Sequence, residues 1–211
     1  MNCEKPNCSN TGEIKSPRDK RKEYLRTMTQ VPIFAVLMVI SARIGISGAP
    51  IPVTLQLPMA ILTGLLIGPW KGAMAQGLYL LMGLIGLPVF SSGGGISYIF
   101  MPSFGFLLGF PISAFCAGLF SRLMTGKSKS SAGVYAALVL SSIAAICACY
   151  LTGAGYMYLF GSFFSGEAVR RMTLREVMAA AVLPFLWKDL IMMLPVAFIA
   201  GRLRKLRVLG S

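Results

Sequence analysis

One acidic side chain, Asp189, lies within a long apolar stretch of this sequence, residues 182–194. A carboxylate near the middle of a bilayer costs about 3 kcal/mol on insertion scales, so such residues usually face a bundle interior or a wet cavity. Asp189 is therefore a candidate acceptor for a ligand or an ion, and the alternative is a structural partner for another polar group. Because neighbours on a helix point about 100° apart, we expect Asp189 to face inward. We expect the preceding Lys188 either to extend toward the membrane interface or to bend over the ligand.

Three segments combine prolines or glycines with hydroxyl or amide groups, and they are the second candidate feature of a site. They span residues 49–56, 86–95 and 101–106. Non-helical backbone at membrane depth is tolerated where protein or a water-filled cavity covers it, and its free N–H and C=O groups can bind a small polar ligand. The candidate binding residues are Thr54, Gln56, Ser91, Gly93, Gly94 and Ser103, and the rings that could wall a cavity are Tyr98, Phe100, Phe104, Phe106 and Trp187. For each ring taken singly, core packing or a place in the interfacial belt is the alternative.

The sequence argues against several kinds of chemistry. It contains no histidine, which removes histidine acid–base catalysis and most zinc sites, and it contains no phosphate-loop pattern. We therefore expect no metal, no cofactor and no ATP bound by this chain. A serine hydrolase would need a base for Ser91 or Ser103, and no triad can be assembled. An enzyme is not expected.

The elements that must position these residues are membrane helices. The chain is 55% hydrophobic and 13% charged over 211 residues, which is typical of one integral membrane domain. Apolar stretches separated by Gly/Pro-rich and charged segments predict an all-α bundle of six transmembrane spans. The expected ranges are 28–46, 55–69, 72–89, 99–124, 133–160 and 178–201. Glycine, alanine and serine recur along these spans, which favours close helix packing.

The distribution of charge predicts how the bundle is oriented. The net charge of +13 does not indicate a nucleic-acid partner, because the basic residues gather at the ends of the expected spans. With the N-terminus inside, 15 Lys and Arg residues fall on the cytoplasmic side and 4 on the outer side. This asymmetry predicts that both termini are cytoplasmic. The expected organisation is a disordered basic tail at 1–27, a membrane domain at 28–205 and a cytoplasmic tail end at 206–211.

Four ordered motifs resemble the BioY family, whose members are the biotin-specific membrane subunits (S components) of energy-coupling-factor (ECF) transporters. The motifs are I-P-V-T-L-Q at 51–56, G-L-P-V-F at 86–90 followed by three glycines at 93–95, P-S-F-G-F-L-L-G-F-P at 102–111 and L-P-F-L-W-K-D-L-I at 183–191. The resemblance covers roughly residues 28–205 with motif order and spacing kept.

This resemblance implies a six-helix S-component fold, a biotin pocket near the outer surface, and a place in the cell membrane. It also implies docking to a transmembrane coupling protein driven by two ATPase subunits. The family's A-x-x-x-A motif in the first helix, which meets that coupling protein, is represented here by Ala35 and Val39.

The resemblance also implies roles for residues of the last motif. In the family pattern P-F-x-x-x-D-L-x-K, the aspartate and the lysine contact biotin. Phe185 and Asp189 match this pattern, whereas Met192 stands at the lysine position. We expect Asp189 to accept from the ureido N–H groups of biotin, with Lys188 or Arg43 as the cation for its carboxylate. The hydroxyls of Thr54, Ser91 and Ser103 would orient the rest of the ligand, and aromatic rings would pack its apolar part.

Two other functions remain open from the sequence. The chain could be an S component for a biotin precursor or another vitamin, because Met192 could mark a differently tuned pocket. It could also be a non-catalytic membrane scaffold or channel subunit, which predicts no saturable binding of a vitamin.

Overall fold

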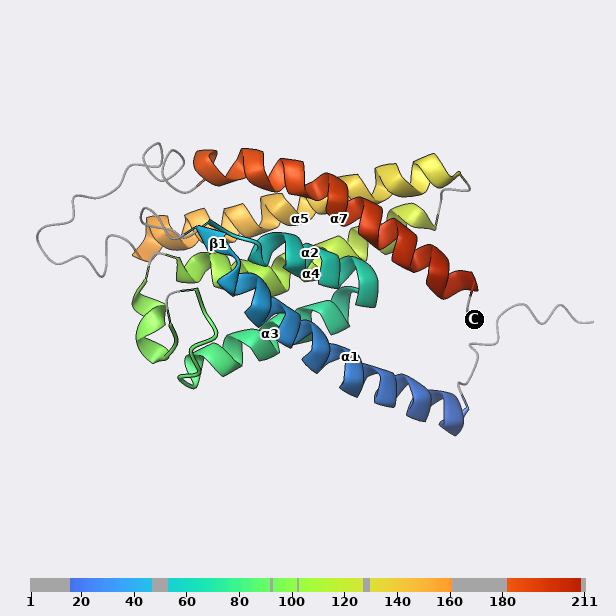
Figure 1. The fold of residues 1–211 in the computed structure, drawn as a ribbon, viewed down its shortest axis with the longest axis horizontal. Coiled ribbons are helices and arrows are strands. Elements are labelled where there is room, and N and C mark those ends of the chain that lie inside the picture. Colours follow the sequence, from blue (N-terminus) through green and yellow to red (C-terminus); the bar gives the residue numbers. More distant parts are fainter. Residues whose placement is uncertain are drawn as a thin grey trace, which may run out of the picture.

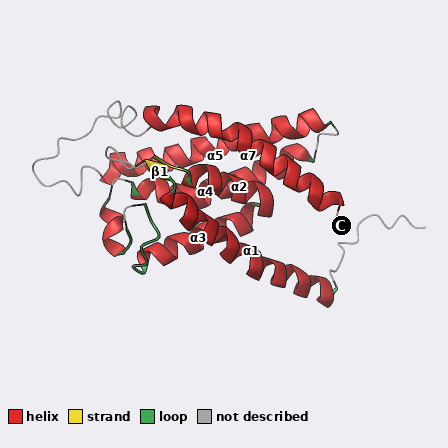
Figure 2. Ribbon diagram, in the orientation of Figure 1, coloured by secondary structure: helices red, strands yellow, loops and turns green. Residues whose placement is uncertain are grey.

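The computed structural model describes residues 16–46, 53–91, 93–101, 103–126, 130–160 and 182–209, and these residues are almost entirely helical (Figures 1 and 2). The helices are α1 (Pro17–Arg43), α2 (Gln56–Ile67), α3 (Pro69–Leu84), the 3₁₀ helix η1 (Ile96–Phe100), α4 (Phe104–Thr125), α5 (Ser131–Phe160) and α7 (Leu183–Leu209). Two short strands, β1 (Gly45–Ile46) and β2 (Val53–Thr54), pair antiparallel between α1 and α2. The expected all-α class is confirmed.

The first helix begins earlier than the sequence predicted. The tail expected to be disordered as far as residue 27 is helical from Pro17 onward, whereas residues 1–15 lie outside the described part. Proline suits the first helical position because its missing N–H has no intrahelical acceptor there. The Lys, Arg and Glu residues that follow are good helix formers. The exposed turns therefore extend the buried part of α1 toward the N-terminus.

A sharp break at Gly68 separates α2 from α3. Gly68 has φ +93°, which favours glycine, and Pro69 begins the next helix. Proline has no N–H to donate to the carbonyl of Leu65, four residues earlier. The guanidinium of Arg204 on α7 supplies the missing donors, with Nε 3.0 Å and Nη2 2.6 Å from that oxygen. A side chain of α7 thus satisfies the carbonyl that the break between α2 and α3 leaves without a backbone donor.

Close helix approaches confirm the packing that the small residues predicted. A Cβ built on Gly64 of α2 would lie 2.0 Å from the carbonyl oxygen of Ala114 on α4. A Cβ on Gly109 of α4 would lie 2.6 Å from the hydroxyl oxygen of Thr152 on α5. Glycine is therefore required at Gly64, because a Cβ there would push the helix backbones apart, and Gly109 lets α5 approach α4 closely.

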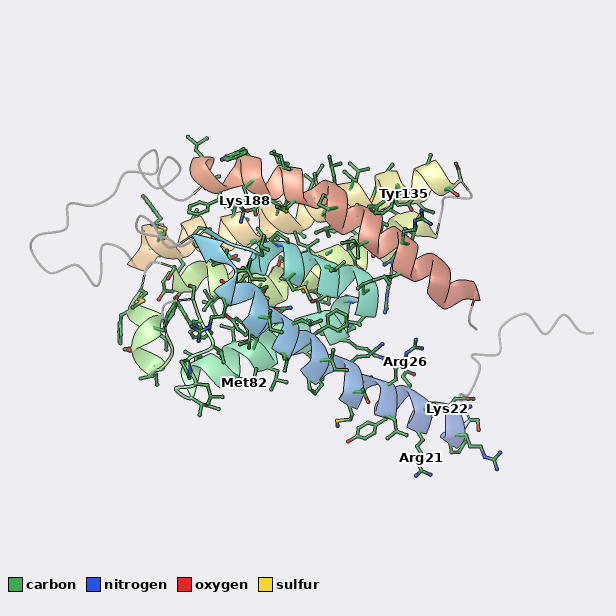
Figure 3. The ribbon with its side chains drawn as sticks, viewed as in Figure 1. Arg21, Lys22, Arg26, Met82, Tyr135 and Lys188 are labelled. Atoms are coloured by element: carbon green, nitrogen blue, oxygen red, sulfur yellow. The ribbon has the colours of Figure 1, made fainter. Side chains whose placement is uncertain are left out.

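Three of the described helices are long and apolar enough to cross a membrane by length and composition: Pro17–Arg43, Phe104–Thr125 and Ser131–Leu159. The apolar helix Gln56–Ile67 is shorter. The start of α1 and the end of α7 lie at one end of the bundle, and β1 lies at the other (Figure 1). Arg21, Lys22 and Arg26 mark the first end, whereas Lys188 lies toward the second (Figure 3).

Candidate functional site

A cavity opens near the end of the bundle that carries β1. The space between its atoms is about 520 Å³ when the open mouth is counted. Helices α2, α4, α5 and α7 supply most of its lining, and the segments before α2, η1 and α4 supply the rest. The lining residues are Thr54, Gln56, Leu57, Ser91, Ser103, Phe106, Leu107, Phe110, Cys149, Tyr150, Phe185, Lys188 and Asp189.

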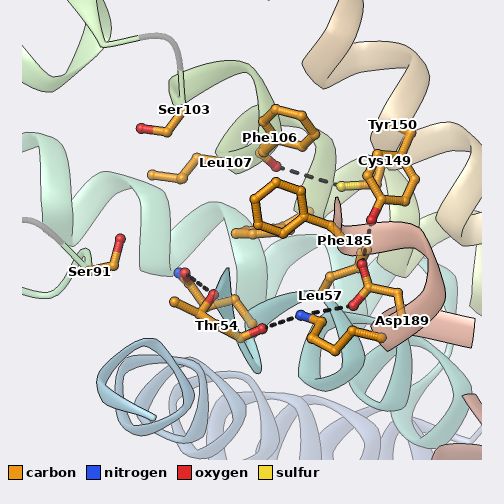
Figure 4. A pocket seen from close by; sticks show the side chains of 13 residues that line it. Thr54, Leu57, Ser91, Ser103, Phe106, Leu107, Cys149, Tyr150, Phe185 and Asp189 are labelled. Carbon is orange, nitrogen blue, oxygen red and sulfur yellow. Dashed lines mark hydrogen bonds and ion pairs between the residues drawn. The ribbon is translucent and has the colours of Figure 1, made fainter. Parts of the chain in front are cut away.

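Asp189 lines this cavity on the side of Tyr150 and Phe185 (Figure 4). It lies two turns into α7 and its side chain is only 4% exposed. One carboxylate oxygen, Oδ2, accepts a hydrogen bond of 2.5 Å from the Tyr150 hydroxyl on α5. The other, Oδ1, lies 3.0 Å from the Lys188 ammonium nitrogen, an ion pair that does not meet hydrogen-bond geometry. Asp189 is thus held by a neutral donor and a cation, with acceptor capacity left on Oδ1.

The sequence left two positions open for Lys188, toward the membrane interface or over the ligand. The structure shows the second, because the side chain lies over the cavity. Although it is the neighbour of Asp189 on one helix, its flexible arm folds back over the site. The ammonium group donates to the backbone oxygen of Thr54 at 2.7 Å as well as pairing with Asp189. Both residues therefore line one cavity. The 100° offset at the backbone is overcome by the length of the lysine side chain.

Polar groups from β2, from the start of α2 and from two later loops also line the cavity. Thr54, in β2, donates to the side-chain oxygen of Gln56 at 2.8 Å, and Gln56 begins α2. Ser91 and Ser103 come from the segments before η1 and α4, and both line the cavity. The structure therefore brings together eight residues singled out in the sequence: Thr54, Gln56, Ser91, Ser103, Phe106, Phe185, Lys188 and Asp189.

Four candidate binding residues lie outside the lining, as do the rings of Phe100 and Phe104. Trp187 is 65% exposed on the outer face of α7. Tyr98 is buried, with its ring against Phe90 at 4.7 Å between centroids and its hydroxyl 3.4 Å from the Ser91 hydroxyl. Gly93 has φ +117° and exchanges backbone hydrogen bonds with Phe90, and Gly94 leaves no space for a Cβ beside the carbonyl of Leu87. In this structure Tyr98 and the two glycines shape or support the loop that carries Ser91.

The sequence did not single out several lining residues. Tyr150 is the most important, since it donates to Asp189 from a position 39 residues away in the chain. Cys149 also lines the cavity, and Leu57, Leu107 and Phe110 complete its apolar part. Phe106, which was expected as a wall, is in the lining. Among the described residues, no group of three His, Cys, Asp or Glu side chains could hold a metal.

Residues outside the cavity bear on two further expectations. Met192 faces a smaller cavity of about 190 Å³ that shares Asp189 and is otherwise lined by Pro58, Ile61, Ser142, Met193 and Val196. The Arg43 guanidinium donates to the backbone oxygen of Pro88 and does not line the main cavity.

The contact with a coupling protein that the sequence predicted at Ala35 and Val39 stays a prediction. Ala35 is 1% exposed and Val39 packs against the core, so both face the bundle. Val36 and Ile40, each more than half exposed, lie on the outer side of this helix.

Comparisons with known proteins agree with one another. The model of the BioY family matches residues 12–208. The biotin transporter BioY of Thermotoga maritima is 34% identical over 87% of this chain and 99% of its own length. The probable biotin transporter BioY of Pyrococcus horikoshii is 31% identical over 85% of this chain and 96% of its own. The solved S component for biotin from an ECF-type ABC transporter has a TM-score of 0.69 at 25% identity, covering 87% of this chain and 93% of that one.

Proposed function

Since the chain belongs to the BioY family, we propose that it is a membrane subunit that captures biotin from outside the cell and delivers it inward with an ATP-driven ECF module. The observation that carries this proposal is the cavity around Asp189. It combines a buried carboxylate, a tyrosine hydroxyl and an ammonium group with an apolar wall. A ligand with N–H donors at one end of an apolar body matches this arrangement.

Asp189 is the acceptor for the ureido N–H groups of biotin. Its Oδ1 has acceptor capacity left, and a hydrogen bond to a charged carboxylate is worth about 1.5–3 kcal/mol. Tyr150 keeps Oδ2 in place, so the carboxylate presents a fixed edge to the ligand. Phe106, Phe110 and Phe185 offer apolar surface for the ring and the valeryl chain. Ser91 and Ser103 offer hydroxyls along the same wall.

Lys188 is the cation of the site. It lines the cavity, whereas the Arg43 guanidinium is bonded to Pro88 outside the lining. Residue 192, where the resemblance expects lysine, is a methionine that faces the smaller, mostly apolar cavity. The site therefore does not need a lysine at position 192 to supply a cation. Lys188 reaches the cavity from the residue just before Asp189 and can follow the ligand's carboxylate on its flexible arm.

The proposed setting is the cell membrane, crossed by six spans with both termini in the cytoplasm. The start of α1 and the end of α7 lie at one end of the bundle, and basic residues of α1 gather there. The cavity then opens toward the outer side. A transmembrane coupling protein and two ATPase subunits would supply the energy, because the sequence carries no phosphate-loop pattern.

A second candidate ligand is a biotin precursor or another vitamin, and Met192 favours it because the cavity that it faces is mostly apolar. Competition of a panel of vitamins and biotin precursors against labelled biotin separates the two. Biotin should displace itself at the lowest concentration of the panel.

Equilibrium binding of radiolabelled biotin to the purified protein is the central test. Asp189→Asn keeps the shape of the side chain and removes the charge, so we expect affinity to fall about 10- to 100-fold. Asp19→Asn is the matched control, because Asp19 is an exposed carboxylate in the first turn of α1. Wild-type affinity in Asp189→Asn would show that this carboxylate is not the acceptor.

A further inference from the structure

A chain of hydrogen bonds leads from the cavity to a tyrosine that does not line it. The Thr54 hydroxyl donates to Gln56 Oε1 at 2.8 Å, and Gln56 Nε2 donates to the Tyr79 hydroxyl oxygen at 2.6 Å. Tyr79 in turn donates to the backbone oxygen of Val89 at 3.3 Å. Both Gln56 and Tyr79 are buried, at 3% and 0% exposure. The backbone oxygen of Thr54 also accepts from Lys188, so this chain is joined to the charged pair.

The protons in this chain can be placed at only one set of atoms if every bond is kept. The Val89 oxygen can only accept, so the single hydroxyl proton of Tyr79 goes to it. The Tyr79 oxygen must then accept, and it accepts from the amide nitrogen of Gln56. Turning the amide over would bring Gln56 Oε1 to Tyr79 and draw the proton away from Val89. Tyr79 therefore fixes which end of the amide is nitrogen and which is oxygen.

The amide of Gln56 keeps unused capacity in this orientation. Nε2 has two hydrogens and Oε1 two lone pairs, and the network uses one of each. One amide hydrogen and one oxygen lone pair therefore remain on a residue that lines the cavity. Such a pair is complementary to an N–H next to a C=O, as in a cyclic urea. An amide free to turn over would lose this selectivity, because it could present either end to the ligand.

We propose that Tyr79 is a positioning residue that makes the site selective for a cyclic urea by holding the amide of Gln56 in one orientation. This inference rests on the proposed function and names a determinant outside the cavity. Tyr79 touches no ligand. Its effect passes through Gln56, so substituting Tyr79 should matter only while Gln56 is present.

The test compares three ligands that share the valeryl chain or its equivalent: biotin, 2-iminobiotin, in which an imino group replaces the ureido oxygen, and desthiobiotin, which keeps the urea and lacks the sulfur. In Tyr79→Phe, we expect the preference for biotin over 2-iminobiotin to shrink about 5- to 20-fold, the size of one hydrogen bond. The preference for biotin over desthiobiotin should stay unchanged. A purely structural role would change both preferences alike or neither, and either result would overturn the inference.

A double-mutant cycle supplies the second measurement. In a Gln56→Leu background, Tyr79→Phe should have no further effect on biotin affinity, and equal effects in both backgrounds would overturn the inference. Thr54→Val, which removes the other anchor of the amide, should reduce the same preference if Tyr79→Phe does not fold. Tyr135→Phe is the matched control. Tyr135 lies near the start of α5, where its ring stacks on that of Phe198, and it does not line the cavity. Wild-type protein that binds no biotin would overturn the proposed function and this inference with it.

Discussion

At the scale of the residue, Lys188 is the side chain whose role the structure changes most. Its ammonium group lies between the Asp189 carboxylate and the Thr54 backbone oxygen, and it lines the cavity. We predict that Lys188→Met weakens biotin binding about 10- to 100-fold, because a desolvated charge pair loses one partner. Binding of biotin amide, which has no carboxylate, should fall less. Calorimetric titration with both ligands measures the difference, and equal losses would mean that the ammonium acts on Asp189 alone.

Residues differ in how far the sequence can predict their place in the site. Asp189 could be found because a charged residue in an apolar span is costly and usually marks a functional site. Tyr150 could not, because a tyrosine in an apolar helix is also typical of an interfacial belt, and its contact depends on how α5 packs against α7. Trp187 was expected in the wall but is exposed. It precedes Asp189 by two residues, which puts it about 200° around the helix.

At the scale of the element, the distance between α2 and α4 is set by Gly64. We predict that Gly64→Ala lowers the stability of the protein in detergent by about 1–3 kcal/mol, because the added Cβ would lie 2.0 Å from the Ala114 oxygen. Gly77→Ala on α3 is the matched control, since no atom lies within 4 Å of its added Cβ. It should be neutral or stabilising by up to about 1 kcal/mol through helix propensity. Equal melting temperatures for the two variants would contradict this account.

The elements themselves were largely predictable, whereas their ends and joints were not. Apolar stretches indicated α2 to α5. The start of α1 at Pro17 was missed because charged residues are compatible with both a disordered tail and an exposed helix. The hydrogen bonds from Arg204 to the Leu65 oxygen at the α2–α3 break could not be predicted from the sequence either. They join residues 139 positions apart, and a basic residue near the C-terminus equally fits a headgroup contact.

At the scale of the whole molecule, helices α2 and α7 take part both in the contact at the α2–α3 break and in the cavity. Arg204 and Asp189 both belong to α7, one bonded to the end of α2 and the other lining the cavity. Gln56 at the start of α2 lines that cavity as well. The two helices are therefore joined near both of their ends, by Arg204 with Leu65 at one and by Lys188 with Thr54, just before α2, at the other. These hydrogen bonds hold α7 against α2 on both sides of the site.

The orientation of the molecule in the membrane is the prediction that belongs to this scale. Of the 20 Lys and Arg residues, 15 fall on one side of a six-span arrangement, and such segments remain in the cytoplasm. A fluorescent protein fused after Ser211 should therefore fluoresce in a bacterial host. Alkaline phosphatase should be active when fused after Gly94, in the loop beside the cavity, and inactive when fused after Gly126, between α4 and α5.

Removing the basic residues Arg122, Lys127 and Lys129 tests the cause of this orientation, because phosphatase activity after Gly126 should then rise. An active fusion at Gly126 in the unaltered chain would mean that the orientation is the reverse of the predicted one. The cavity would then open toward the cytoplasm, and the protein could not capture a ligand from outside.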